Sequence, residues 1–279
     1  MLKQRILTGL ILAPIMIGGI FYLPVPEFML FIGAIAALGA WEWANLSGIT
    51  NKVGRVVYAA IVASLLVALQ HFDLEQEADV LYGALAWWVL ALILVATHPK
   101  LQSIWKSTPV RLLMGLVILV PMWVGFVQIK SYPYSDYLML YVMFLVWGAD
   151  VGAYFAGRTF GKRKLAPNVS PGKTWEGVYG GLATTMLFAV AAGLILQNKI
   201  MMDLTTKQWA LLFGITLAVT VVSVVGDLVE SMVKRLRGIK DSSNLLPGHG
   251  GVMDRIDSMT AALPVFALAL SYAGWNVIF

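Results

Sequence analysis

Long apolar runs alternate with short polar segments from one end of the chain to the other. Most runs are about 18–21 residues long, which is the length a helix needs to cross a hydrocarbon core of ~30 Å. Only helices and closed barrels satisfy the backbone in lipid, and uninterrupted runs of this length indicate helices. We therefore predict an all-α integral membrane protein with about nine transmembrane helices. The runs cover 6–23, 28–46, 55–70, 79–97, 111–130, 137–157, 177–197, 209–229 and 259–279, of which the third is the shortest.

Composition agrees with this pattern and excludes several classes of protein. The 279 residues are 59% hydrophobic and 13% charged, and the mean hydropathy is +0.79. A soluble domain carries about 25% charged residues. A soluble enzyme, a disordered tail and a nucleic-acid-binding domain are excluded, so no nucleic-acid partner is expected. The chain has no cysteine, which excludes disulfides, thiolate metal sites and cysteine nucleophiles.

The distribution of basic residues predicts the orientation. If the N-terminus is cytoplasmic and all nine runs span, only Lys130, Lys199 and Lys207 of the 20 lysines and arginines fall on the opposite side. This asymmetry obeys the positive-inside rule. The C-terminus is then predicted on the opposite side of the membrane. The first run lacks a convincing cleavage site, so we interpret it as a retained helix.

Two predicted cytoplasmic segments, 158–176 and 230–258, are longer than the other loops. They divide the chain into N-terminal transmembrane helices, about five of them in 1–136, and a catalytic transmembrane region in 137–279. Long polar segments on one face of a membrane protein are where a soluble co-substrate could react.

Two pairs of acidic residues flank the second of these segments. Asp227 and Glu230 are three residues apart, as are Asp254 and Asp257, and this spacing places each pair on one helix face. Ionisable residues near the membrane interior are functional candidates. Carboxylates close to phosphate-binding cations predict a Mg²⁺ site. The alternative is a pair of solvated helix ends.

Two further acidic residues carry weaker signals. Glu42 lies between Trp41 and Trp43, and we interpret these tryptophans as interface anchors beside a carboxylate that reaches water. Asp150 follows Gly148 in a small-residue stretch that favours close helix packing. Asp150 is equally compatible with a structural role and an active-site role.

The segment between the acidic pairs has features of a phosphate-binding loop. It carries four cations and a Pro247-Gly248-His249-Gly250-Gly251 turn that leads into Asp254-Arg255. Glycine allows backbone N–H groups to approach a phosphate, and a helix N-terminus adds a favourable dipole. A cytoplasmic basic cluster would explain Lys234 and Arg235 but not the glycine turn. His249 has no partner at zinc-binding spacing.

The other long segment ends in Gly172-Lys173-Thr174. A P-loop requires a glycine where Pro167 stands, and we predict no strand before this tripeptide, so a P-loop is excluded. A phosphate contact from Gly-Lys-Thr just before a helix remains the expectation.

The 27 residues from Ser231 to Asp257 resemble the signature of the phosphatidate cytidylyltransferase (CDP-diacylglycerol synthase) family. The resemblance covers the whole chain and is sharp over 147–178 and 223–258. The matching positions include Lys234-Arg235, Lys240-Asp241, His249-Gly250-Gly251, Asp254-Arg255 and Asp257, with Arg158 and Ser170-Pro171-Gly172-Lys173-Thr174 upstream.

The resemblance implies an enzyme that joins CTP and phosphatidate to give CDP-diacylglycerol and pyrophosphate with Mg²⁺, and a second cation is possible. It further implies a homodimer with a cytoplasmic active site in membrane lipid. Asp227 and Asp254 are the leading metal ligands, with Asp257 and Glu230 as further candidates. The other predicted site residues are Lys173 and His249 in catalysis, and Ser170, Thr174, Arg158, Lys234, Arg235, Lys240, Asp241, Gly250, Gly251 and Arg255 in substrate binding.

Other functions remain possible on sequence grounds. The nearest alternative is a CTP-dependent kinase of a lipid or polyprenol alcohol. A CDP-alcohol phosphotransferase is disfavoured because the chain has no Asp-Gly-x-x-Ala-Arg stretch. A transporter would place paired charges at the bilayer midplane. The compact length and the lack of a cleavable signal predict a bacterial inner membrane.

Overall fold

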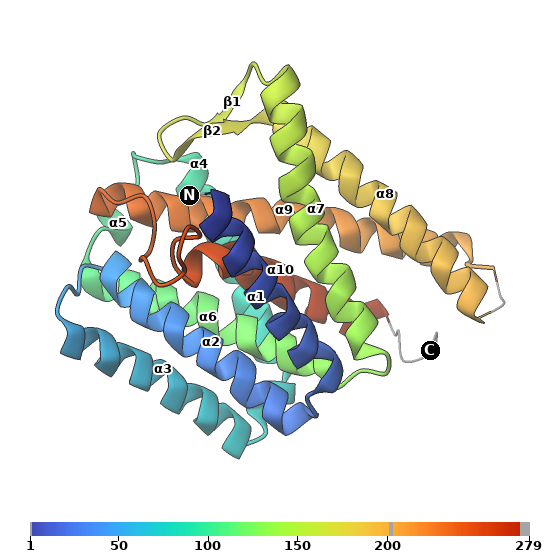
Figure 1. Cartoon of the computed structure of the whole chain (residues 1–279), viewed down its shortest axis with the longest axis horizontal. Helices are drawn as coiled ribbons and strands as arrows, with labels where there is room; N and C mark the ends of the chain where they lie inside the picture. Colours follow the sequence, from blue (N-terminus) through green and yellow to red (C-terminus); the bar gives the residue numbers. More distant parts are fainter. Residues whose placement is uncertain (1, 201–202, 274–279) are drawn as a thin grey trace.

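The computed structural model describes residues 2–200 and 203–273, and most of them lie in helices (Figure 1). The long helices are α1 (Leu2–Tyr22), α2 (Val25–Leu46), α3 (Lys52–His71), α4 (Ala78–Ala96), α6 (Thr108–Lys130), α7 (Ser135–Phe160), α8 (Trp175–Ile200), α9 (Thr206–Arg237) and α10 (Met253–Ala273). The short elements are the 3-10 helix η1 (Leu74–Gln76), α5 (Gln102–Trp105) and the strands β1 (Lys164–Ala166) and β2 (Ser170–Thr174).

The helices confirm the predicted class of fold. Among the described residues, eight helices are long and apolar enough to cross a membrane, and α1 contributes a shorter apolar stretch, Leu7–Tyr22. Each of the nine predicted runs coincides with one long helix. The last residues of the ninth run, 274–279, lie outside the described residues. The orientation of the termini stays a prediction.

The two long polar segments contain more regular structure than expected. Helix α7 continues to Phe160, α9 continues to Arg237, and α10 begins at Met253, so the second loop is only 238–252. Strands β1 and β2 form an antiparallel hairpin that pairs Lys164 with Thr174. The expectation that no strand accompanies Gly172-Lys173-Thr174 was wrong, since the tripeptide itself lies in β2. The sequence did not reveal the strand because its five residues include a proline and a glycine and show no alternation of apolar and polar positions.

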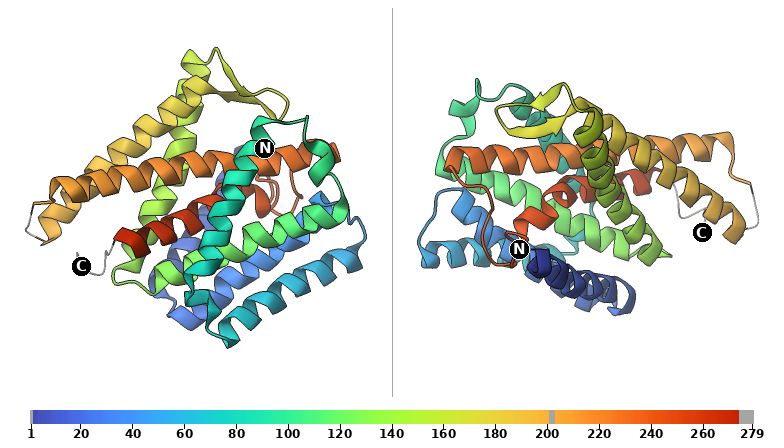
Figure 2. Two further views of the ribbon diagram at one scale, coloured as in Figure 1. Left: turned by 180° about the vertical axis from the view of Figure 1, so that it is seen from behind. Right: turned by 45° about the horizontal axis from the view of Figure 1, so that its top comes forward.

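Helix α9 runs across the molecule between two groups of helices (Figures 1 and 2). The α7–α8 pair and its hairpin lie on one side, and α10, α6 and α2 lie on the other. Helix α9 contacts α10, α8, α7, α4 and β2. Side chains that project from its C-terminal half therefore face both groups.

Glycines allow the helices around α9 to approach closely. A Cβ on Gly226 of α9 would lie 2.6 Å from the backbone oxygen of Asp257 in α10. Gly152 of α7 and Gly180 of α8 are similarly close to each other's helices. Small residues at such crossings let helix backbones pack against each other in lipid. The crossing at Gly226 brings the acidic pair of α9 next to that of α10.

We expect Gly226→Ala to lower thermal stability in detergent. The added methyl group forces α9 and α10 apart, and overpacking of this kind costs about 1–3 kcal/mol. Gly214→Ala is the matched control on the same helix, because no heavy atom lies within 4 Å of its Cβ position. The control should be neutral or stabilising by up to ~1 kcal/mol through helix propensity. Equal melting temperatures for the two variants would contradict the close crossing.

Candidate active site

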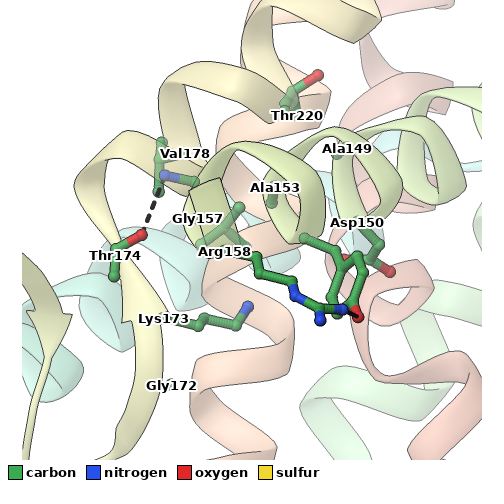
Figure 3. A pocket seen from close by; sticks show the side chains of 14 residues that line it. Ala149, Asp150, Ala153, Gly157, Arg158, Gly172, Lys173, Thr174, Val178 and Thr220 are labelled. Atoms are coloured by element: carbon green, nitrogen blue, oxygen red, sulfur yellow. Dashed lines mark hydrogen bonds between the residues drawn. The ribbon is translucent and has the colours of Figure 1, made fainter. Parts of the chain in front are cut away.

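A pocket of about 350 Å³ lies between α7, β2, α8 and α9. Its charged wall carries Asp150, Arg158 and Lys173, and Thr220 and Val224 of α9 line it as well. Figure 3 shows the Lys173 amine pointing from β2 toward the side of α7 that carries Arg158 and Asp150. The Arg158 guanidinium donates a hydrogen bond to the hydroxyl of Tyr154, at 2.9 Å. The pocket thus combines cations with an apolar lining, which suits an amphipathic phosphate ester.

Strand β2 places Lys173 directly against α9. The Lys173 amine is 2.6 Å from one carboxylate oxygen of Asp227, and both side chains are about one-quarter exposed. Ser231, one turn later on α9, donates a hydrogen bond to the other oxygen of Asp227. Thr174, which follows Lys173 in the chain, accepts a hydrogen bond from the backbone N–H of Gly177 with its side-chain oxygen and so caps α8. Lys173 therefore projects from a backbone that is fixed on its C-terminal side.

The hairpin is tied to the rest of the molecule by two further contacts. The Glu176 carboxylate accepts hydrogen bonds from the backbone N–H groups of Lys162 and Arg163. The Arg235 guanidinium donates to the backbone oxygen of Val169, which is buried. Arg235 was predicted to bind substrate, and this stays a prediction; in the structure its Nε joins α9 to the hairpin.

Lys234 links the two predicted acidic pairs. Its amine contacts Glu230 on the preceding turn of α9 and lies 2.7 Å from Asp254 on α10. The Glu230 side chain is 1% exposed, and among the described residues its second oxygen has no hydrogen-bond partner. A buried carboxylate oxygen without a partner is costly unless a cation or water satisfies it.

Asp254 is surrounded by hydrogen-bond donors. Its second oxygen accepts hydrogen bonds from the N–H and hydroxyl of Ser242 and from the N–H of Gly251, at 2.7–2.9 Å. Together with Lys234, these contacts hold the loop against the first turn of α10. Gly250 has φ +78°, a conformation that favours glycine, and a Cβ there would lie 2.5 Å from the Asp254 carboxylate.

Asp257 and Arg255 complete the charged cluster. Asp257 lies within electrostatic range of Asp227, Lys234 and Asp150, and Asp150 lies within range of Lys173 and Arg255. Within the described part of the chain, no three acidic or histidine side chains gather closely enough to form a metal cage. Two lysines contact the carboxylates instead: Lys173 contacts Asp227, and Lys234 contacts Glu230 and Asp254. The hard oxygen donors and the unpartnered oxygen of Glu230 nevertheless fit the divalent cation that the sequence predicted.

The remaining predicted residues occupy the loop and the hairpin. Lys240 and Asp241 are exposed in the loop, and Ser170 is half-buried in β2. The backbone N–H of His249 donates to the backbone oxygen of Leu246 within a tight turn. In the described structure, the buried Nδ1 of the His249 ring has no hydrogen-bond partner. None of these residues takes part in the ion pairs that the described structure shows for the cluster.

Glu42 of α2 is the residue that the sequence interpretation placed wrongly. Its side chain is fully buried, and the neighbouring Trp43 is also fully buried, so this part of α2 does not reach water as expected. The Glu42 carboxylate accepts hydrogen bonds from the loop that carries the signature. A carboxylate inside an apolar helix was the available signal, but its partners lie about 200 residues away in the sequence.

The fold and the site together define a polytopic helical membrane protein whose cations and carboxylates meet at one end of four long helices and a hairpin. The model of the cytidylyltransferase family matches residues 3–273, and the chain belongs to this family. It is similar to proteins named phosphatidate cytidylyltransferase from three bacteria. Identity is 56% with that of Pseudomonas aeruginosa, over 99% of both chains. It is 40% with that of Haemophilus influenzae, over 96% of this chain and 98% of the relative, and 32% with that of Bacillus subtilis, over the same shares.

Proposed function

We propose that this protein is a phosphatidate cytidylyltransferase, which joins CTP and phosphatidate to give CDP-diacylglycerol and pyrophosphate. The observation that carries the proposal is the similarity to enzymes of that name over nearly the full chain. The pocket supports it, because cations and apolar side chains line the same cavity. A lipid phosphate and a nucleotide could therefore meet at this end of the helices.

In this reaction a phosphate oxygen of phosphatidate attacks the α-phosphorus of CTP. A new P–O bond forms, the bond between the α-phosphorus and the oxygen bridging to the β-phosphorus breaks, and pyrophosphate leaves. A phosphate monoester has a second pKa of about 6 and is largely a dianion at neutral pH, so no strong base is needed. Because both reactants are anionic, the protein must hold them together and neutralise charge.

We assign the cations by their positions in the structure. Lys173 and Arg158 line the pocket, where they can bind phosphate oxygens. Arg255 follows Asp254 at the start of α10 and faces the same cluster. In this proposal, Lys173 serves the nucleotide phosphates and Arg158 serves the lipid phosphate.

Mg²⁺ is the cation that we propose for the site. Asp227 and Asp254 would hold it, with Glu230 and Asp257 close by. When bound, it would supply positive charge to offset that of the anionic reactants and of the pyrophosphate that leaves. In the structure, Asp227 pairs with Lys173 and Asp254 pairs with Lys234. In this proposal, the same two lysines supply positive charge beside the carboxylates that would hold the cation.

The proposed setting is the inner membrane of a bacterium, with the site facing the cytoplasm and the enzyme acting as a homodimer. The positive-inside distribution supports this orientation, because the two long segments that form the site, 158–176 and 230–258, carry ten of the 20 lysines and arginines. The family resemblance supports the dimer.

The test uses purified protein in detergent with phosphatidate, Mg²⁺ and CTP labelled with ³²P at the α-phosphate. We expect label in the organic phase, and EDTA should abolish it. Transfer of label from the γ-phosphate to a lipid alcohol, with none from the α-phosphate, would replace this proposal with a lipid kinase. Folded protein that transfers neither label would overturn both.

A further inference from the structure

Glu42 connects the N-terminal helices to the signature loop. Its carboxylate comes from α2 and receives four hydrogen bonds from the loop and the start of α10. The donors are the hydroxyls of Ser242 and Ser243 and the backbone N–H groups of Val252 and Met253, at 2.5–3.1 Å. A Cβ on Gly251 would overlap the Ser242 hydroxyl and both oxygens of Glu42. The loop is therefore shaped around this carboxylate.

The contacts are divided evenly between the two carboxylate oxygens. Oε1 accepts from the Ser243 hydroxyl and the Val252 N–H, and Oε2 accepts from the Ser242 hydroxyl and the Met253 N–H. A glutamine at this position would direct its NH₂ group toward a backbone N–H in either orientation of the amide. The site thus requires two acceptor oxygens, which only a carboxylate provides.

A short path leads from Glu42 to the charged cluster. The Ser242 hydroxyl lies 3.1 Å from Glu42 Oε2 and 2.8 Å from Asp254 Oδ2, and Asp254 contacts Lys234. The N–H of Ser242 also donates to Asp254. Ser242 is fully buried, so water does not compete for these contacts. Any shift of the loop away from Glu42 would move the donors that orient Asp254.

We infer that Glu42 is a positioning residue for the cytidylyl transfer reaction: it holds 242–253 against α10 so that Asp254 and Lys234 keep their places. The inference rests on the proposed function for its effect on turnover, but the hold on the loop does not depend on that function. Glu42 does not line the pocket, and it acts on the reactants through the loop that it holds and through Asp254.

The principal variant is Glu42→Gln in the full chain, in detergent. We expect turnover with CTP and phosphatidate to fall about 10-fold while the KM for CTP changes less than threefold. Hydrogen exchange of 242–253 should become faster, and exchange of the 164–174 hairpin should not change. Glu75→Gln is the matched control, because Glu75 is also a buried glutamate but lies in η1 and is packed against α3 and α6.

Two further variants keep the inference testable if Glu42→Gln does not fold. Glu42→Asp retains both oxygens and should fall between wild type and Glu42→Gln in turnover. Ser242→Ala removes the hydroxyl between Glu42 and Asp254 and should lower turnover several-fold. The double variant of Ser242→Ala with Glu42→Asp should lose less than the product of the two single effects, because both act on one path.

The outcomes separate this inference from the proposed function. If wild-type protein transfers no cytidylyl group, the proposed function fails, and hydrogen exchange alone decides the role of Glu42. If wild type is active and Glu42→Gln matches Glu75→Gln in turnover and exchange, the inference is overturned. Lower turnover in Glu42→Asp than in Glu42→Gln would also overturn it, because side-chain length would then matter more than the carboxylate.

Discussion

Replacing Asp227 with asparagine is expected to lower turnover by at least about 100-fold, the size of effect seen when one preorganised electrostatic contact is removed from an active site. The side chain keeps its shape, and its remaining oxygen can still accept from the Ser231 hydroxyl. The negative charge that faces Lys173 at 2.6 Å is lost. The variant therefore removes the charge of the site with little change in packing.

Turnover measured across a Mg²⁺ titration, together with the melting temperature, checks this prediction. Asp73→Asn is the matched control, because Asp73 is exposed and has φ 54°, a conformation that asparagine tolerates. The control should match wild type in both measurements. Asp227→Asn with turnover within threefold of wild type at every Mg²⁺ concentration would remove Asp227 from the site.

Gly251→Ala is expected to lower turnover about 10- to 100-fold. Its Cβ would overlap the Ser242 hydroxyl and the Glu42 carboxylate, and all three groups are buried. Overpacking of a filled site costs about 1–3 kcal/mol. Here that cost is relieved by moving the loop, which displaces the Gly251 N–H from Asp254. The melting temperature should fall by a few degrees.

A compensating variant distinguishes this cause from general misfolding. Glu42→Asp shortens the opposing side chain by one methylene, so the double variant should recover part of the turnover lost in Gly251→Ala. Gly83→Ala, where no heavy atom lies within 4 Å, is the control for the substitution itself and should behave as wild type. A double variant that is worse than Gly251→Ala alone would contradict the steric explanation.

The nine long helices were predictable because each contains a long apolar run. A run of that length occurs only in a membrane-spanning helix or in the core of a large protein. The signature loop was also visible, since Pro247 to Gly251 breaks this pattern in a strongly polar segment. The hairpin was not, because contacts from Glu176 and Arg235 hold it in place and no periodic pattern marks it. Such contacts depend on how the helices pack.

The same limit applies to the candidate site. Asp227 and Glu230 both lie on α9, and Asp254 at the start of α10 contacts Lys234 of α9. Spacing could not show that Asp254 is surrounded by donors or that Lys173 pairs with Asp227, because these partners come from different elements. The environment of Glu42 was predicted wrongly for the same reason. Its hydrogen-bond donors lie some 200 residues away in the sequence, so no local pattern reveals them.

Helix α9 has 32 residues and is therefore about 48 Å long, whereas a hydrocarbon core is about 30 Å thick. From Lys207, near its start, the helix reaches Asp227 after a rise of about 30 Å. A helix that crossed the membrane perpendicular to its plane would therefore have Lys207 and Asp227 at the two boundaries of the hydrocarbon core, with the turns from Glu230 to Arg237 among the headgroups. In that orientation and in the proposed reaction, the phosphate of a membrane lipid would reach the depth of Asp227 without leaving its leaflet. A water-soluble nucleotide can reach that depth without entering the hydrocarbon.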